Sequence, residues 1–216
     1  MGFYGEILQI VFLTLFVSVT STLIAAGAGM VIAIPVALKE FKLKKYIVRL
    51  SETLMSTPPV LMGLVVYLLL SRKGIFGNFR LLFTPAAMII AQSLLVFPIV
   101  FGLTVSAIGK QGREIKKNCI AIGAGPKYTL LLIVMECKSQ LISVVAAGFG
   151  RAISEVGAVM MVGGNIKGET RVMTTYIALE TGQGNFNKAL IIGMILLIIS
   201  LMVNFVLHGF NNMDEN

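Results

Sequence analysis

Long apolar runs without charged residues alternate with shorter polar and basic segments along this chain. A helix needs roughly 20 apolar residues to cross a hydrocarbon core about 30 Å thick. Barrel-type alternation of apolar and polar residues is absent, and a helix satisfies its own backbone groups in lipid. We therefore expect an all-α polytopic membrane helical bundle of about five transmembrane helices, in one domain covering 1–216 with its core at 7–207. The expected spans cover residues 7–37, 53–71, 84–108, 140–164 and 189–207.

Prolines and small residues modify this pattern in three of the spans. The second span must include residues 53–57 to reach sufficient length, or else it is discontinuous at Pro58 and Pro59. Pro98 lies inside the third span and predicts a kink, because proline removes a backbone donor and crowds the preceding turn. In the first span small residues recur at every fourth position, which permits close helix contact in lipid. They are Ala25, Gly29 and Ala33.

The composition excludes an ordinary soluble domain, since charged residues make up only 13% of the chain, about half the usual share. The net charge of +8 can be explained by membrane topology, without binding to a nucleic acid. Eleven basic residues lie in two segments, 38–50 and 110–138, whereas six lie in the segments on the other side of the predicted membrane. Because basic loops stay in the cytoplasm, we expect both segments inside, the N-terminus outside and the C-terminus cytoplasmic. Residues 38–50 then form a basic loop, and 165–188 a polar connection outside.

The second basic segment is apolar as well as charged, which a simple solvated loop is not. Ile115, Cys119 and Ile122 share one helix face, and a Gly123–Ala124–Gly125 stretch ends that helix. Pro126 suits the first position of a following helix. The pattern predicts a knob of two short helices around a glycine turn. Such a knob docks in a partner, lies on the membrane surface, or is an interfacial loop without a partner.

Segment 114–136 resembles the cytoplasmic coupling loop, the EAA loop, of binding-protein-dependent ABC permeases. That pattern is Glu-Ala-Ala, three residues, Gly, nine residues, Ile, one residue and Leu-Pro. With its glycine on Gly123, the isoleucine position falls on Ile133. The departures from the pattern are Lys117, Asn118 and Cys119 in place of Glu-Ala-Ala, and Met135 and Glu136 in place of Leu-Pro.

Other stretches extend the resemblance to about residues 7–207. Residues 55–64, with their double proline, look like the start of the second core helix in molybdate, sulfate and tungstate permeases. Further segments are similar to the tungstate-type members in particular; they cover residues 81–92, 148–166, 170–175 and 178–181.

The resemblance implies the permease core of a type I ABC importer in the cell membrane of a prokaryote. Its substrate would be a tetrahedral oxyanion, with tungstate first, then molybdate, then sulfate. It also implies a homodimer, two cytoplasmic ABC ATPase subunits that use ATP and Mg²⁺, and an extracytoplasmic oxyanion-binding protein. This chain would then be no enzyme. The residues implied to couple it to the ATPase are Lys117, Cys119, Gly123, Ala124, Gly125 and Pro126.

Arg151 and Glu155 are the only charges well inside an apolar span. Charged groups in lipid are costly, so they face a bundle interior or water, and the four-residue spacing puts both on one face. They form either a structural ion pair or, with Ser154, part of the translocation path and its gate. Because a lone carboxylate can take up a proton, Glu155→Gln is expected to be the more damaging change.

We expect no metal site and no cofactor bound by this chain, because Cys119 and Cys137 lack metal-ligand spacing. A phosphate-binding loop is also absent, so the chain would not hydrolyse ATP itself. The main alternative is an ion-coupled secondary carrier or a channel without an ATPase partner. Many such carriers have internal repeats, and none is visible here. A membrane enzyme would need clustered carboxylates or histidines, and the acidic residues here are dispersed.

Overall fold

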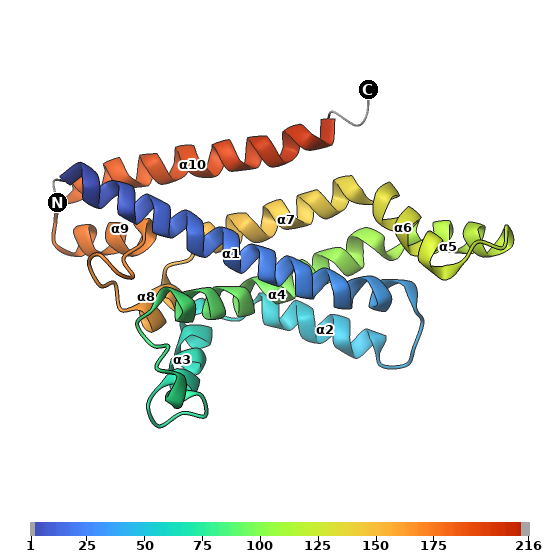
Figure 1. Ribbon diagram of the computed structural model, residues 1–216, viewed down its shortest axis with the longest axis horizontal. Helices are drawn as coiled ribbons and strands as arrows, with labels where there is room; N and C mark the ends of the chain where they lie inside the picture. Colours follow the sequence, from blue (N-terminus) through green and yellow to red (C-terminus); the bar gives the residue numbers. More distant parts are fainter. Residues whose placement is uncertain (1–2, 213–216) are drawn as a thin grey trace.

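Three long apolar helices run along the long axis of the molecule (Figure 1). The computed structural model describes residues 3–212, so the ends of the predicted domain, 1–2 and 213–216, lie outside the described residues. The long helices are α1 (Phe3–Leu38), α4 (Pro85–Gly109) and α10 (Phe186–Asn212). Each is long and apolar enough to cross a membrane. Pro85 stands in the first turn of α4, where the Thr84 hydroxyl accepts a hydrogen bond from the Ala87 amide, as a helix start requires.

Shorter helices fill the rest of the described chain, and no strand occurs in it, so the all-α prediction is confirmed there. They are α2 (Lys44–Met55), α3 (Pro59–Leu70), the 3₁₀ turn η1 (Gly77–Phe79), α5 (Gln111–Ala121), α6 (Pro126–Glu136), α7 (Lys138–Ile153), α8 (Gly157–Gly163) and α9 (Met173–Gly182).

Two pairs of these helices are bent spans. The pair α2–α3 bends by 99° and the pair α6–α7 by 64°. The structure thus has three candidate spans, or up to five if each bent pair crosses the membrane once. The discontinuity considered for the second span is present, because Pro59 opens α3 and a proline there cannot continue the preceding helix.

Three predicted boundaries are wrong. The basic loop 38–50 becomes helical from Lys44 onward. The predicted span 140–164 is not one helix, since α7 ends at Ile153 and α8 begins at Gly157. The polar connection 165–188 contains α9, whose Met173 and Tyr176 are buried with Ile10 and Ile192. In each case, contacts with distant segments stabilise a local structure that composition alone did not indicate.

The centre of the core is the contact between α1 and α4. The predicted small-residue stripe lies there: Ala25 and Ala33 are buried, and a Cβ added at Gly29 would come within 2.9 Å of Val100 on α4. The close approach predicted from the four-residue spacing is therefore confirmed. Helix α7 packs on both α1 and α4 and completes the centre of the bundle.

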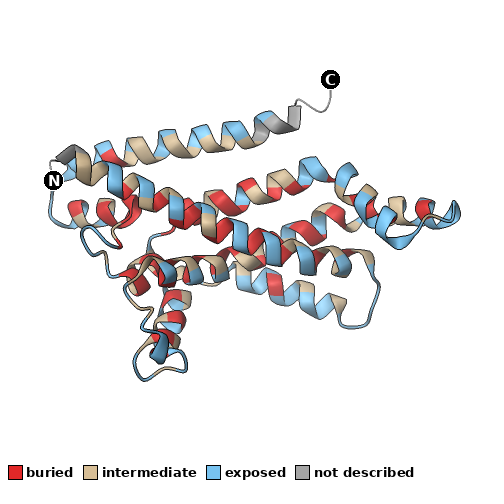
Figure 2. Cartoon of the chain, viewed as in Figure 1, coloured by how far each residue is buried: buried red, intermediate tan, exposed pale blue. Residues whose placement is uncertain are grey.

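Helix α10 is packed far less closely than α4. Only 6% of its apolar window is buried, against 56% for α4. Its main contacts are with α9 and α7, and the rest of its length stands apart from the bundle in Figure 2. Most of this helix therefore presents apolar side chains to lipid or to another chain.

Candidate functional site

Arg151 and Glu155 form the ion pair that their spacing predicts. An Arg151 Nη1–H donates to Glu155 Oε2 at 2.6 Å. The Glu155 side chain is 2% exposed and that of Arg151 is 31% exposed. Charge-assisted hydrogen bonds of this kind are among the stronger ones in proteins. The pair therefore compensates a carboxylate that would otherwise be buried alone.

Glu155 also stabilises the interruption between α7 and α8. Its second carboxylate oxygen, Oε1, accepts a hydrogen bond from the Ala158 amide at 2.9 Å, in the first turn of α8. A negative group there satisfies a free backbone donor and suits the positive end of the helix. The Glu155 carbonyl in turn accepts from the Thr174 hydroxyl of α9 at 2.8 Å. This one residue thus joins α7, α8 and α9.

Ser154 does not join the ion pair. Its hydroxyl donates to the backbone carbonyls of Gly150 and Arg151 and so completes the last turn of α7. Ser154 is exposed, and its neighbour Val156 is exposed as well. Of the three predicted residues, Glu155 is therefore buried, Ser154 is at the surface, and the half-buried Arg151 lies between the interior and the surface.

A polar junction behind this pair was missed by the sequence reasoning. Gln92 on α4 is buried, accepts a hydrogen bond from Ser21 of α1 and donates one to the Ala152 carbonyl of α7. A cavity of about 10 Å³ lies beside Gln92 and Glu155, which is room for at most about one water. The available signal was that Gln92 is the only amide side chain within the apolar run 84–108.

The predicted knob has the shape expected from its glycines and proline. Helices α5 and α6 meet at a turn in which Gly123 has φ +74°. The Gly123 amide donates to the Ile120 carbonyl and the Ala124 amide to the Cys119 carbonyl, which is the Schellman arrangement for a helix end. Pro126 is the first residue of α6. The turn is therefore defined by local backbone geometry.

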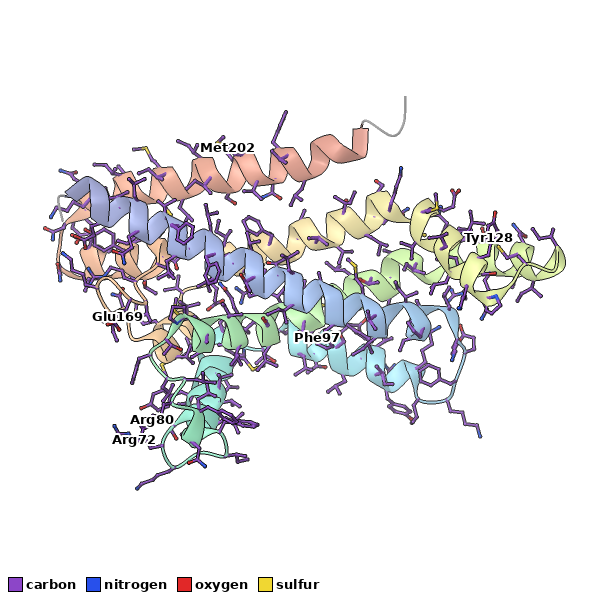
Figure 3. All side chains as sticks on the ribbon, viewed as in Figure 1. Arg72, Arg80, Phe97, Tyr128, Glu169 and Met202 are labelled. Carbon is purple, nitrogen blue, oxygen red and sulfur yellow. The ribbon has the colours of Figure 1, made fainter. Side chains whose placement is uncertain are left out.

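The other predicted coupling residues divide between an inner and an outer face of the knob. Cys119 is buried, Ala124 is half-buried, and Lys117 and Gly125 are exposed. Large apolar side chains are exposed around the turn, with Ile122 78% exposed and Tyr128 marking this end of the molecule in Figure 3. The exposed apolar residues next to the turn include Ile120, Ile122, Tyr128, Leu130 and Leu131.

Helices α6 and α7 connect the knob directly to the charged pair. Ile133 of α6 and Cys137, at the bend, are buried in a cluster with Ala37 and Ile108. From that bend α7 continues to Arg151 in its last turn, about 20 Å along the helix axis from Lys138. The knob and the α7–α8 break lie toward opposite ends of the molecule (Figure 1). Helix α7 therefore extends from the buried base of the knob to the Arg151–Glu155 pair.

Comparison with known proteins agrees with this architecture. Residues 25–213 match the family described as "Binding-protein-dependent transport system inner membrane component". A tungstate uptake system permease protein, TupB, of Peptoclostridium acidaminophilum is 46% identical over 208 residues, which is 96% of this chain and 91% of the relative. The TupB protein of Campylobacter jejuni is 40% identical over 78% of this chain and 71% of its own length. A probable anion ABC transporter permease of Haloferax volcanii is 36% identical over 92% and 88%.

The resemblance that the sequence indicated is thus confirmed at the level of the family. The match covers most of the chain, including α4, the knob, α7 and the charged pair. The helices long enough to cross a membrane agree with an inner membrane component. This chain therefore belongs to the family of binding-protein-dependent transport system inner membrane components, the ABC importer permeases, and is a multi-pass protein of the cell membrane.

Proposed function

We propose that this chain is the permease subunit of an ATP-driven importer for tetrahedral oxyanions, with tungstate as the first substrate, then molybdate and sulfate. The observation that carries the proposal is the continuity from the knob through α6 and α7 to the Arg151–Glu155 pair. The substrate order is supported by the two tungstate permeases that are 46% and 40% identical to this chain. Sulfate permeases are more distant, at 24% to 26% identity.

The translocation path in this proposal lies between two copies of the chain. The cavity beside Glu155 and Gln92 is only about 10 Å³, too small for an oxyanion to pass through the bundle. A path along the outer face, past the half-exposed Arg151 and the exposed Ser154, needs a second wall. A homodimer supplies that wall. Arg151 then offers positive charge to the passing anion while remaining paired with Glu155.

The knob in this proposal docks on a cytoplasmic ABC ATPase. Two ATPase subunits use ATP and Mg²⁺, while this chain binds neither and is not itself an enzyme. ATP binding closes the ATPase pair, the knobs move, and the path opens outward to receive the anion from an extracytoplasmic binding protein. Support comes from the exposed apolar side chains around a turn of defined backbone shape. Coupling is assigned to Lys117, Cys119, Gly123, Ala124, Gly125 and Pro126.

The proposed topology puts the N-terminus outside and the C-terminus in the cytoplasm, as the distribution of basic residues favours. It is tested by single-cysteine labelling at positions 78 and 116, in a background lacking Cys119 and Cys137. A membrane-impermeant reagent should reach position 78 from outside and position 116 only from the cytoplasmic side. Labelling of both positions from one side contradicts the topology.

Uptake by the reconstituted transporter tests the function itself. Vesicles containing this chain, its ATPase and its binding protein should accumulate tungsten, measured by elemental mass spectrometry, only with ATP. Excess molybdate should reduce this tungsten accumulation more strongly than excess sulfate. Uptake that needs no ATP and collapses with the ion gradient would instead establish an ion-coupled carrier, which remains the alternative function.

A further inference from the structure

A large basic cavity, open to solvent on one side, lies on the arm formed by α3 and η1. Its volume is about 990 Å³, at the upper end of the range typical of ligand pockets. Arg72, Lys73 and Arg80 line it together with the polar side chains of Ser71 and Asn78. No carboxylate is among the lining residues. The cavity therefore offers hydrogen-bond donors and positive charge without an internal counter-ion.

The three cations are unpaired within the part of the chain that the structure describes. None of the ion pairs or side-chain hydrogen bonds found among residues 3–212 involves them. Lys167 and Arg171, near the start of α1, are different, because both bind the Glu6 carboxylate. Like charges gathered in one cavity repel one another, and an anion between them relieves that repulsion.

The backbone is constrained at Arg80, while the side chains of all three cations are exposed. Arg80 has φ 50° and ψ 40°, a left-handed conformation that is costly for residues other than glycine. Phe83, which also lines the cavity, has φ 63° and donates its amide to the Val162 carbonyl of α8 at 2.9 Å. Such backbone conformations persist where surrounding structure enforces them, and they gather at ligand clamps. Figure 3 shows Arg72 and Arg80 extending on the same side of the arm.

The arm lies toward the end of the molecule opposite the knob, near α8 (Figure 1). In the proposed topology this is the external end. Three cations within a nine-residue external stretch, 72–80, run against the tendency of basic residues to stay inside. A ligand outside the cytoplasm accounts for them, and guanidinium groups together with the Asn78 amide suit a phosphate-like anion.

We propose that this cavity is an external binding site for a tetrahedral oxyanion group. The group is either a free anion such as tungstate or phosphate, or the phosphate of a lipid headgroup, and the chemistry of the contacts is shared. The site goes beyond the proposed transport function, because binding here requires neither ATP nor passage across the membrane.

The experiment measures binding of two probes to the purified full-length permease in phospholipid-free detergent. Tungstate is added alone, and bound tungsten is counted after equilibrium dialysis by elemental mass spectrometry. Phosphatidylglycerol is titrated separately and bound copies are counted by native mass spectrometry. The main variant is Arg80→Asn, because asparagine tolerates the left-handed backbone while removing the charge. Arg72→Gln is the second variant. Lys188→Gln is the control, since Lys188 is an exposed cation at the start of α10, outside this cavity.

Both charge-removing variants should weaken binding of one probe about tenfold or more, with Lys188→Gln unchanged. Loss of tungstate binding identifies a free-anion site, and loss confined to phosphatidylglycerol identifies a lipid-phosphate site. If neither probe binds, or if all variants bind like the wild type, the proposal is overturned. The melting temperature of Arg80→Asn should equal that of the wild type, which shows that the variant is folded. If Arg80→Asn unfolds, Lys73→Gln, at an exposed position of the same cavity, takes its place. Failure of ATP-driven uptake would leave these measurements unaffected, so the two proposals are tested apart.

Discussion

The helices are interrupted at two places important to the proposed function, and different interactions hold the two breaks. Between α7 and α8, Glu155 binds Arg151, the Ala158 amide and the Thr174 hydroxyl, so three elements meet there. Between α5 and α6, the hydrogen bonds of the turn run within residues 119–124. A Cβ added at Gly123 would meet nothing within 4 Å.

The α7–α8 break is thus stabilised by tertiary contacts, whereas the turn of the knob is stabilised by local backbone hydrogen bonds. The α7–α8 break depends on side chains from distant parts of the chain, so its disruption should affect folding and assembly. The knob depends on its own backbone and is exposed, so its disruption should leave a folded permease that cannot be coupled to a partner.

The largest effect is expected at the buried charge pair. Arg151→Gln leaves a carboxylate that is only 2% exposed, whereas Glu155→Gln leaves a guanidinium that is 31% exposed and can be hydrated. The glutamine oxygen can also still accept the Ala158 hydrogen bond. These exposures argue for the opposite order to the one expected from sequence. Arg151→Gln should cost about 3–5 kcal/mol and Glu155→Gln less, measured as the yield and melting temperature of the assembled complex.

Replacing both Arg151 and Glu155 distinguishes a structural role of the pair from a role in transport. If the pair only locks the fold, Arg151→Gln with Glu155→Gln should recover both assembly and uptake. If Arg151 also borders the path, assembly should recover while tungstate uptake per assembled complex stays low. Full uptake by the double variant would remove Arg151 from the proposed path.

A smaller effect is expected at the polar junction behind the pair. Gln92→Leu removes the hydrogen bonds to Ser21 and to the Ala152 carbonyl in a buried site. The loss should be about 1–2 kcal/mol, seen as a lower melting temperature. Ser93→Ala is the control, since Ser93 is only part-buried and makes one long bond, 3.3 Å, to the Ser21 carbonyl. Equal melting temperatures for Gln92→Leu and the wild type would show that the junction contributes nothing.

The knob should respond to backbone conformation with little change in stability. Gly123→Ala forces a side chain into φ +74° and should cost only about 1 kcal/mol locally. Nevertheless it should lower transport-linked ATP hydrolysis, and Gly123→Leu should abolish it. Gly182→Ala is the matched control, because Gly182 ends α9 outside the knob, lacks a positive φ and has open space around it. Normal transport by Gly123→Leu would show that the turn is not the coupling element.

The smallest effect concerns the ion pairs of Glu40, which follows α1, with Lys44 of α2 and Arg113 of α5. Lys44 donates a hydrogen bond to Glu40 and holds the pKa of that carboxyl below its ordinary value, and Arg113 lies 3.5 Å away. A lowered pKa means that the stabilisation is complete above the ordinary value and is lost as pH falls through the lowered one. Exposed pairs contribute little. The small melting-temperature difference between the wild type and Glu40→Gln should therefore shrink at acid pH. Glu52→Gln should show no such change, because Glu52 is exposed and forms no ion pair among the described residues.

Local features of the fold followed from the sequence. The uncharged runs predicted the long helices, and Pro58–Pro59 indicated a break as one of two outcomes. Gly123 and Pro126 defined the turn and the start of α6, because positive φ and a missing amide are properties of single residues. The family could also be recognised, since its motifs are contiguous stretches of sequence.

Tertiary structure alone decided how these pieces meet. The four-residue spacing predicted that Arg151 and Glu155 pair, but not that α7 ends between them, because that break is stabilised by Thr174 and the Ala158 amide. The role of Gln92 depends on Ser21, 71 positions away, and on Ala152, 60 positions away. The basic cavity on the α3 arm likewise requires the fold that brings Arg72 and Arg80 to one side. Burial and long-range hydrogen bonds arise only when distant segments pack, so the local sequence can mark Gln92 as unusual in an apolar run but cannot identify its partners.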